Sequence, residues 1–280
     1  MKQIMILAIT LLTTTVFGYV DQKLPDGKWA YYGQEFYATL ESNRKFEKTF
    51  FAQIFNEPHQ TTNGRPDVIG NNCHRSKCYH HSPVGYDAAR KIMFGELDTL
   101  RDNKGTYVLD VYCGRKFYFQ SLDEVSNMHT QVNIEHTWPQ SKFSGRFPKD
   151  LQKSDMHHLY LTDSQANSIR GNNPFGYVGS DDDRTGGEGC RKSKMGLIDG
   201  NAVYTPPAPH RGNVARALFY FSIRYELPIT KSEEDILRQW HKVDPIDADE
   251  IIRHEAIAKH QKTRNPFIDH PELSDKISDF

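Results

Sequence analysis

Residues 132–173 read VNIEHTWPQSKFSGRFPKDLQKSDMHHLYLTDSQANSIRGNN, and their pattern sets the architecture that we expect for the whole chain. Residues 132–136 alternate apolar and polar side chains before a proline, which predicts a short strand. Residues 156–161 (MHHLYL) predict a second strand. Residues 164–170 predict a short helix with Ser164 as its N-cap and a glycine at its end. The expected order is therefore strand, loop, strand, helix.

Three polar residues of this segment suggest chemistry at a phosphodiester. Glu135 and His136 lie where the first predicted strand becomes loop, and Asn167 lies in the predicted helix. Carboxylate and amide oxygens suit a hard divalent cation such as Mg²⁺, which can stabilise charge on a leaving oxygen. An imidazole with an ordinary pKa of about 6.5 suits a base that deprotonates water. The residues therefore predict hydrolysis with one metal ion.

Simpler interpretations of the same residues exist. A Glu-His pair at the end of a strand is more often solvated or structural than catalytic, and Asn167 could equally hydrogen-bond at the start of a helix. If residues 156–161 form a strand, His157 and His158 point to opposite faces, and His157 is a candidate for an active-site role. Asp155 is expected either to orient a functional side chain or to stabilise a turn.

The motifs also carry a family resemblance. NIEHTWPQS, SDMHHLYLTD and ANSIRGN, followed by PPAPHRGNVARALFYF and NPFI, resemble the bacterial endonuclease I family of periplasmic or secreted, sequence-nonspecific nucleases. The resemblance covers residues 86–268. It implies an α+β fold, a helix-rich single domain around a ββα-metal (His-Me finger) core at about residues 132–173. It further implies that His136 is the general base and that Glu135 and Asn167 bind the metal.

The family also uses an arginine to stabilise the transition state. Arg146 is the first candidate because it lies in the loop between the two predicted strands, and Lys142, Arg170 and Arg211 compete with it. The net charge of −1 means that phosphate contacts must come from a local basic surface. The residues expected to supply these contacts are Lys142, Arg146, Lys149, Lys153, Arg170 and Arg211.

The N-terminus predicts export. Residues 1–18 (MKQIMILAITLLTTTVFG) combine Lys2, an apolar run and small residues before a plausible cleavage position, which predicts a secretory signal peptide too short to span a membrane. We therefore expect residues 19–280 to form a periplasmic or secreted nuclease domain, a monomer without a membrane partner.

Four cysteines fit an exported chain, because disulfides persist in oxidising compartments. Three pairings are possible, and we favour Cys73 with Cys78, which leaves Cys113 with Cys190. The alternative is a zinc site built from Cys73, Cys78 and two of the nearby histidines, His74, His80 and His81.

The remaining sequence supports a sizeable core, since 37% of the 280 residues are hydrophobic. Helical patterns cover residues 31–55, 86–100, 212–226, 232–240 and 247–262, and residues 106–112 predict a strand in which Asp110 is a surface or turn-supporting carboxylate.

The sequence as a whole predicts an exported Mg²⁺-dependent endonuclease that cuts DNA and possibly RNA, with Ca²⁺ or Mn²⁺ as alternative metals. Contacts to the nucleic-acid backbone would make cleavage largely independent of sequence. Two rival functions are a secreted zinc-dependent hydrolase with a third ligand near His136 and His157, and a catalytically inactive nucleic-acid-binding protein.

Overall fold

The computed structural model describes residues 20–70, 78–121, 123–124, 130–178, 184–185, 190 and 192–280. The predicted signal peptide, Cys73 and His74 lie outside the described residues. None of the described helices is long and apolar enough to cross a membrane.

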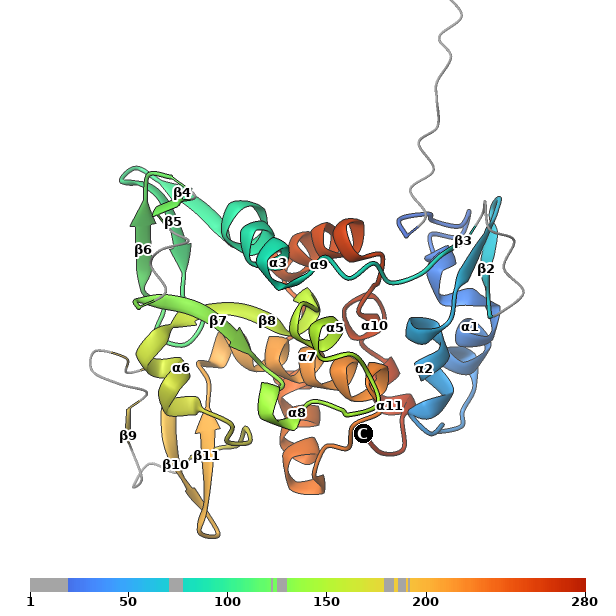
Figure 1. The fold of residues 1–280 in the computed structure, drawn as a ribbon. Coiled ribbons are helices and arrows are strands. Elements are labelled where there is room, and N and C mark those ends of the chain that lie inside the picture. Colours follow the sequence, from blue (N-terminus) through green and yellow to red (C-terminus); the bar gives the residue numbers. More distant parts are fainter. Residues whose placement is uncertain are drawn as a thin grey trace, which may run out of the picture.

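The fold is a mixed α+β arrangement in which helices surround several small antiparallel sheets (Figure 1). The helices are α1 Gly33–Glu41, α2 Thr49–Asn56, α3 Tyr86–Ile92, α5 Lys149–Lys153, α6 Ser164–Arg170, α7 Arg211–Arg224, α8 Lys231–Val243, α9 Ala248–Gln261, α10 Pro266–Asp269 and α11 Leu273–Lys276. The strands are β1 His59–Thr62, β2 Arg65–Ile69, β3 Cys78–Tyr79, β4 Thr99–Asp102, β5 Gly105–Leu109, β6 Lys116–Phe119, β7 Val132–His136, β8 Leu159–Asp163, β9 Arg184–Thr185, β10 Lys194–Ile198 and β11 Asn201–Thr205.

The described strands form four sheets with the orders β2-β1-β3, β4-β5-β6, β7-β8 and β11-β10-β9. Figure 1 shows α1, α2 and β1–β3 on one side of the molecule and β4–β6 on the opposite side, with α7 between them. Every residue of α7 from Val214 to Arg224 is buried, so this helix is packed all round rather than along one stripe.

Strands β7 and β8 pair antiparallel, with Glu135 opposite Tyr160 and His136 opposite Leu159, and α6 follows β8 directly. The expected order of strand, loop, strand and helix is therefore present. Apolar side chains of β7 and β8 pack into a hydrophobic cluster with β5, β6, α3 and α9. This packing leaves the C-terminal end of β7 next to α6, where the two elements bring their polar side chains together.

Two local predictions about this unit are wrong. Residues Met156–His158 form a 3₁₀ turn instead of the first half of a strand, because the Asp155 side chain accepts a hydrogen bond from the His157 backbone N–H and caps the turn. The N-cap of α6 is Asp163 instead of Ser164, since its carboxylate accepts from the backbone N–H groups of Gln165 and Ala166. A carboxylate at this position also interacts favourably with the helix dipole.

Candidate active site

A cavity of about 260 Å³ lies where β7 ends beside α6. Its lining residues are Ile134, Glu135, His136, Pro139, Gln140, Ser141, Asn167, Arg170, Gly171 and Asn172. The three residues expected to carry the chemistry, Glu135, His136 and Asn167, therefore share one cavity. A larger cavity of about 490 Å³ between α1, α2 and β2 has no histidine among its described lining residues.

The carboxylate of Glu135 is almost completely buried, with 1% of the residue exposed. Its Oε1 atom accepts a hydrogen bond from the Tyr112 hydroxyl at 2.9 Å and lies 2.9 Å from Nη1 of Arg170. Burial raises the pKa of Glu135, while the charge of Arg170 and the Tyr112 hydrogen bond oppose this rise. Both partners bind the same oxygen, Oε1. Among the described residues, Oε2 is therefore left for another ligand.

The imidazole of His136 is fixed by a backbone carbonyl. Its Nε2 atom lies 3.1 Å from the carbonyl oxygen of Lys153, and its Nδ1 atom lies 3.4 Å from the side-chain nitrogen of Gln140. A carbonyl oxygen can only accept, so Nε2 carries the hydrogen and Nδ1 keeps its lone pair on the side of the cavity-lining Gln140.

Burial lowers the pKa of His136 to about 3, and the charges of His158, Lys153 and Arg170 act in the same direction, while the hydrogen bond to the Lys153 carbonyl opposes them. The ring stacks on Tyr86 at a centroid distance of 5.7 Å. His136 is therefore neutral over the physiological pH range and available as a proton acceptor.

The side-chain amide of Asn167 has only one orientation compatible with its neighbours. Its Nδ2 atom lies 2.7 Å from Oδ1 of Asn133 and 3.3 Å from the carbonyl oxygen of Ile134. Because the Ile134 carbonyl can only accept, the amide nitrogen must face it. The Oδ1 atom of Asn167 consequently points away from β7 and can serve as a ligand.

Arg170 occupies a different place from the one expected of a nucleic-acid contact. The residue is 2% exposed, and its guanidinium donates to the carbonyl oxygens of His136 at 3.1 Å and Thr137 at 2.7 Å. It also lies over the ring of Phe175. Arg170 therefore lines the cavity from the protein side, with its guanidinium already bound to Glu135 and to two backbone carbonyls.

The other basic candidates lie outside the lining of this cavity. Arg146 is exposed and forms an ion pair with Glu226. Arg211 donates to the Pro206 carbonyl oxygen and lies over Tyr177. The exposed side chains of Lys142 and Lys149 belong to η3 (Gln140–Lys142) and α5, which flank the loop that follows β7. Lys153 lies over the ring of Tyr86, the same ring that stacks on His136.

The structure places His157 away from the cavity. It is 3% exposed, its Nε2 atom lies 3.0 Å from the carbonyl oxygen of Thr263, and its ring packs against Tyr220. The adjacent His158 is also buried, with Nε2 2.8 Å from the Gln152 carbonyl oxygen. Both side chains are used to hold the turn between α5 and β8, which explains why neither one lines the cavity.

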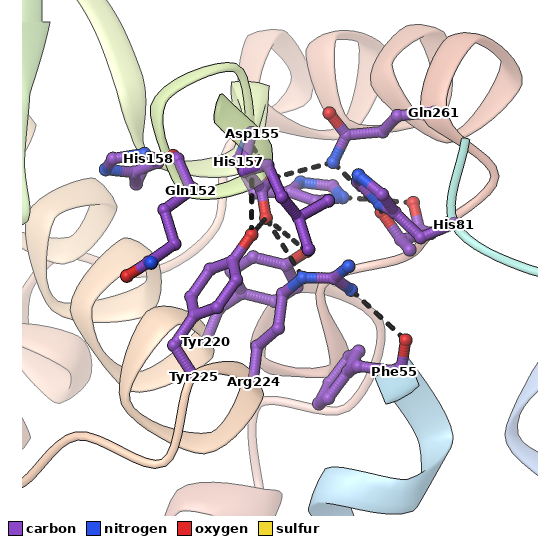
Figure 2. Close-up of polar contacts among 12 residues, drawn as sticks. Phe55, His81, Gln152, Asp155, His157, His158, Tyr220, Arg224, Tyr225 and Gln261 are labelled. Carbon is purple, nitrogen blue, oxygen red and sulfur yellow. Dashed lines mark hydrogen bonds and ion pairs between the residues drawn. The ribbon is translucent and has the colours of Figure 1, made fainter. Parts of the chain in front are cut away.

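The side chain of Asp155 links this turn to residues of α7 and α9 (Figure 2). Its carboxylate accepts hydrogen bonds from Tyr220 at 2.9 Å, Tyr225 at 2.8 Å and Gln261 at 2.7 Å, and lies 3.3 Å from Nε of Arg224. Burial alone would raise the pKa of Asp155, but the Arg224 charge and the nearby histidines hold it well below its usual range. Asp155 is therefore a buried anion that joins the turn after α5 to α7 and α9.

The described residues contain one group that could hold a metal by its ligand types, namely His254, Glu255 and Asp269. Arg264 already binds both carboxylates of this group, with Nε 2.7 Å from Asp269. No described cluster of this kind includes His136 or His157. The alternative zinc site built around Cys73 and Cys78 is also not supported, because Cys78 is disulfide-bonded and cannot serve as a thiolate ligand.

The predicted disulfide between Cys113 and Cys190 is present, with a Cα–Cα distance of 4.6 Å. It lies next to Tyr112, whose backbone carbonyl accepts from Ser193 and whose backbone N–H donates to Asp110. Asp110 is buried and supports the turn after β5, so the turn-supporting alternative is confirmed and the surface alternative is wrong. The second predicted pair, Cys73 with Cys78, includes a residue outside the described ones.

Sequence reasoning missed Tyr112, Asn133 and Gln140 as members of the site. Asn133 could have been noticed, since a strand with period 2 places it on the face opposite to Ile134, toward a following helix. Tyr112 offered no local signal, because it reaches Glu135 from a distant turn.

Comparison with known proteins identifies relatives of this chain. The family model described as Endonuclease I matches residues 71–272, which include every residue that lines the 260 Å³ cavity. An extracellular ribonuclease of Bacillus subtilis is 36% identical over 164 residues, covering 52% of this chain and 53% of the ribonuclease. An extracellular deoxyribonuclease of Aeromonas hydrophila is 31% identical over 119 residues, covering 42% of this chain and 49% of that protein. Endonuclease-1 of Buchnera aphidicola is 24% identical over 185 residues, covering 56% of this chain and 72% of that protein. The chain spans about half the length of the first two relatives.

Proposed function

Because this chain belongs to the endonuclease I family, we propose that it is an exported, metal-dependent endonuclease that hydrolyses phosphodiester bonds of DNA or RNA without sequence preference. The observation that carries the proposal is the convergence of Glu135, His136 and Asn167 on one cavity. Among the described residues, Glu135 Oε2 and Asn167 Oδ1 remain open to a ligand, and His136 Nδ1 is an acceptor that faces the Gln140 amide. The core of β7, β8 and α6 is the ββα-metal, or His-Me finger, unit of this proposal.

The donor set of the cavity fits a hard divalent cation. Glu135 supplies a carboxylate oxygen and Asn167 an amide oxygen, and both residues line the same cavity. Mg²⁺ binds such oxygen ligands while keeping several waters, and Ca²⁺ or Mn²⁺ accept similar ligands. When bound, the cation would stabilise negative charge on the phosphate and the leaving oxygen.

His136 acts as the general base in this proposal. Its Nδ1 lone pair accepts a proton from the attacking water, and the Nε2–H bond to the Lys153 carbonyl stabilises the imidazolium that forms. The pKa of about 3 applies to the cavity without substrate. A phosphodiester anion beside the ring favours the charged form of His136, whereas a bound cation would oppose it.

Charge neutralisation at the phosphate needs basic residues beyond the cavity lining, because Arg170 is buried and paired with Glu135. We assign these contacts to the exposed Lys142, Arg146 and Lys149 and to the partly exposed Arg211. Arg146 would have to leave Glu226, which is feasible because exposed ion pairs contribute only about 0–1 kcal/mol.

The relatives support export and leave the nucleic acid open. Their names include an extracellular ribonuclease and extracellular and periplasmic deoxyribonucleases. The Cys113–Cys190 disulfide agrees with an oxidising compartment. We infer that the chain acts outside the cytoplasm and accepts a nucleic-acid backbone as its substrate.

The test is incubation of the purified protein with supercoiled plasmid and with a structured RNA, each with Mg²⁺ and with EDTA. Cleavage of either polymer only with the cation supports the proposal and defines the substrate. Binding of both polymers without cleavage under Mg²⁺, Mn²⁺ or Ca²⁺ would instead identify a nucleic-acid-binding protein.

A further inference from the structure

We propose that Tyr112, Asn133 and Arg170 position the proposed metal ligands, Glu135 and Asn167, by binding the side-chain atoms of these two residues that face away from the cation. Glu135 Oε2 and Asn167 Oδ1 are thereby directed into the cavity before a metal arrives. This inference rests on the proposed function, because it assigns a role relative to the same cation.

The carboxylate of Glu135 is held from one side. Tyr112 and Arg170 both bind Oε1 at 2.9 Å, one through a hydroxyl and the other through a guanidinium. Two donors on one oxygen fix the rotation of the carboxylate about its last side-chain bond, since any turn would break both contacts. The second oxygen must then face the remaining open direction, which is the cavity.

The two residues that hold Glu135 are themselves immobilised. The guanidinium of Arg170 donates to the carbonyl oxygens of His136 and Thr137, so its position is set by the backbone that follows β7. Tyr112 is completely buried and is followed by the disulfide-bonded Cys113. Arg170 and Tyr112 are therefore fixed in place and restrict the orientation of the Glu135 carboxylate.

The amide of Asn167 is held in an equivalent way. Its nitrogen faces the backbone carbonyl of Ile134, and the side-chain oxygen Oδ1 of Asn133 accepts the other N–H at 2.7 Å. Without Asn133, one N–H would lose its acceptor and the amide would gain rotational freedom. Asn133 therefore selects the rotamer in which the oxygen is available to a cation.

Such positioning has a measurable consequence for affinity. Removing a residue that orients a metal ligand typically weakens metal binding by about 10- to 100-fold. Because the oriented ligands are still present, a higher concentration of the cation restores binding. This pattern separates positioning from a general loss of structure, which added metal would not repair.

The experiment is calorimetric titration of the full chain with Mn²⁺ alone, with wild type beside Tyr112→Phe and Asn133→Ala. Tyr204→Phe is the matched control, because its ring lies 4.9 Å from that of Tyr112 and its described contacts include no hydrogen bond to Glu135. Asn133→Asp is the second control, since it keeps an acceptor oxygen for Asn167. Thermal melting checks that each variant is folded.

We expect the dissociation constant for Mn²⁺ to rise about tenfold or more in Tyr112→Phe and Asn133→Ala and less than about twofold in Tyr204→Phe. Asn133→Asp should bind at least as tightly as wild type. Equal affinity in wild type, Tyr112→Phe and Asn133→Ala, combined with loss of binding in Glu135→Ala, would overturn this inference and leave the metal site intact. Failure of wild type to bind Mn²⁺ in a manner that depends on Glu135 would overturn both.

Discussion

The Nε2 atom of His136 lies 3.1 Å from the carbonyl oxygen of Lys153, seventeen positions further along the chain. This contact decides which ring nitrogen carries the hydrogen and directs the other one toward the cavity. Lys153 is the last residue of α5, and Asp155, two residues further on, binds side chains of α7 and α9, so the orientation of the proposed base depends on buried contacts outside the cavity lining.

The first prediction concerns the metal ligands. Glu135→Gln and Asn167→Ala should raise the Mg²⁺ concentration needed for half-maximal cleavage by at least about tenfold, because each substitution weakens or removes an oxygen donor. Asn172→Ala, which alters another residue of the same cavity lining, should leave the Mg²⁺ requirement nearly unchanged. Identical Mg²⁺ titrations in wild type and both variants would exclude Glu135 and Asn167 as ligands.

The second prediction concerns the buried anion at Asp155. Asp155→Ala should lower the free energy of unfolding by about 3–5 kcal/mol, since it leaves Arg224 buried without its carboxylate. Asp150→Ala, on the exposed side of α5, should change it by less than about 0.5 kcal/mol. Urea unfolding monitored by circular dichroism measures both values, and equal stabilities would rule out a structural role for the Asp155 contacts.

The third prediction concerns pH and stability. Burial lowers the pKa of His136 and His157 to about 3 and that of His158 to about 4, below the value of about 6.5 in the unfolded chain. The unfolded chain therefore binds protons first as the pH falls, and stability that is complete above about pH 6.5 is lost toward pH 4. Each histidine contributes a slope of up to about 1.4 kcal/mol per pH unit, and the raised pKa of Glu135 offsets part of the loss at the acidic end.

Urea unfolding at pH 7.5, 6.5 and 5.5 tests this slope. The free energy of unfolding should fall by about 2 kcal/mol or more between the last two values. A constant free energy over this interval would mean that the three histidines are not held neutral by the fold.

The fourth prediction concerns the disulfide. The Cys113–Cys190 bond closes a loop with a sequence separation of 77. Replacing both cysteines by alanine should lower the free energy of unfolding by about 4 kcal/mol, because a long loop gains much conformational freedom in the unfolded chain. A double variant as stable as the oxidised wild type would contradict a structural role for this bond.

Much of the candidate site could be predicted from sequence because its proposed metal ligands lie in short, contiguous motifs. The alternation in residues 132–136 and the helix over residues 164–170 gave the correct elements, and the endonuclease I resemblance is confirmed by the family match. The boundary at residues 156–158 was wrong because an aspartate cap overrode the strand propensity of the following residues. Sequence patterns predicted the regular elements well, but they did not predict where a side-chain hydrogen bond replaces the expected strand.

The positions of the basic residues could not be predicted from the sequence. A charge in the sequence carries no information about burial, so Arg170 looked like a phosphate contact although its partners are Glu135 and two backbone carbonyls. Tyr112 and Arg224 were likewise unpredictable, since each one meets its carboxylate partner through the tertiary fold. Residues that support a site from a distance require the structure.

The most direct test of the account is the rate of plasmid cleavage by His136→Ala relative to wild type under saturating Mg²⁺. His80→Ala, an exposed histidine outside the cavity lining, is the control, and thermal melting confirms folding. We expect a rate lower by about 10² to 10⁴ in His136→Ala, the contribution usual for a general base, and an unchanged rate in His80→Ala. Cleavage by folded His136→Ala at the wild-type rate would contradict the assignment of His136 as the base and, with it, the proposed mechanism.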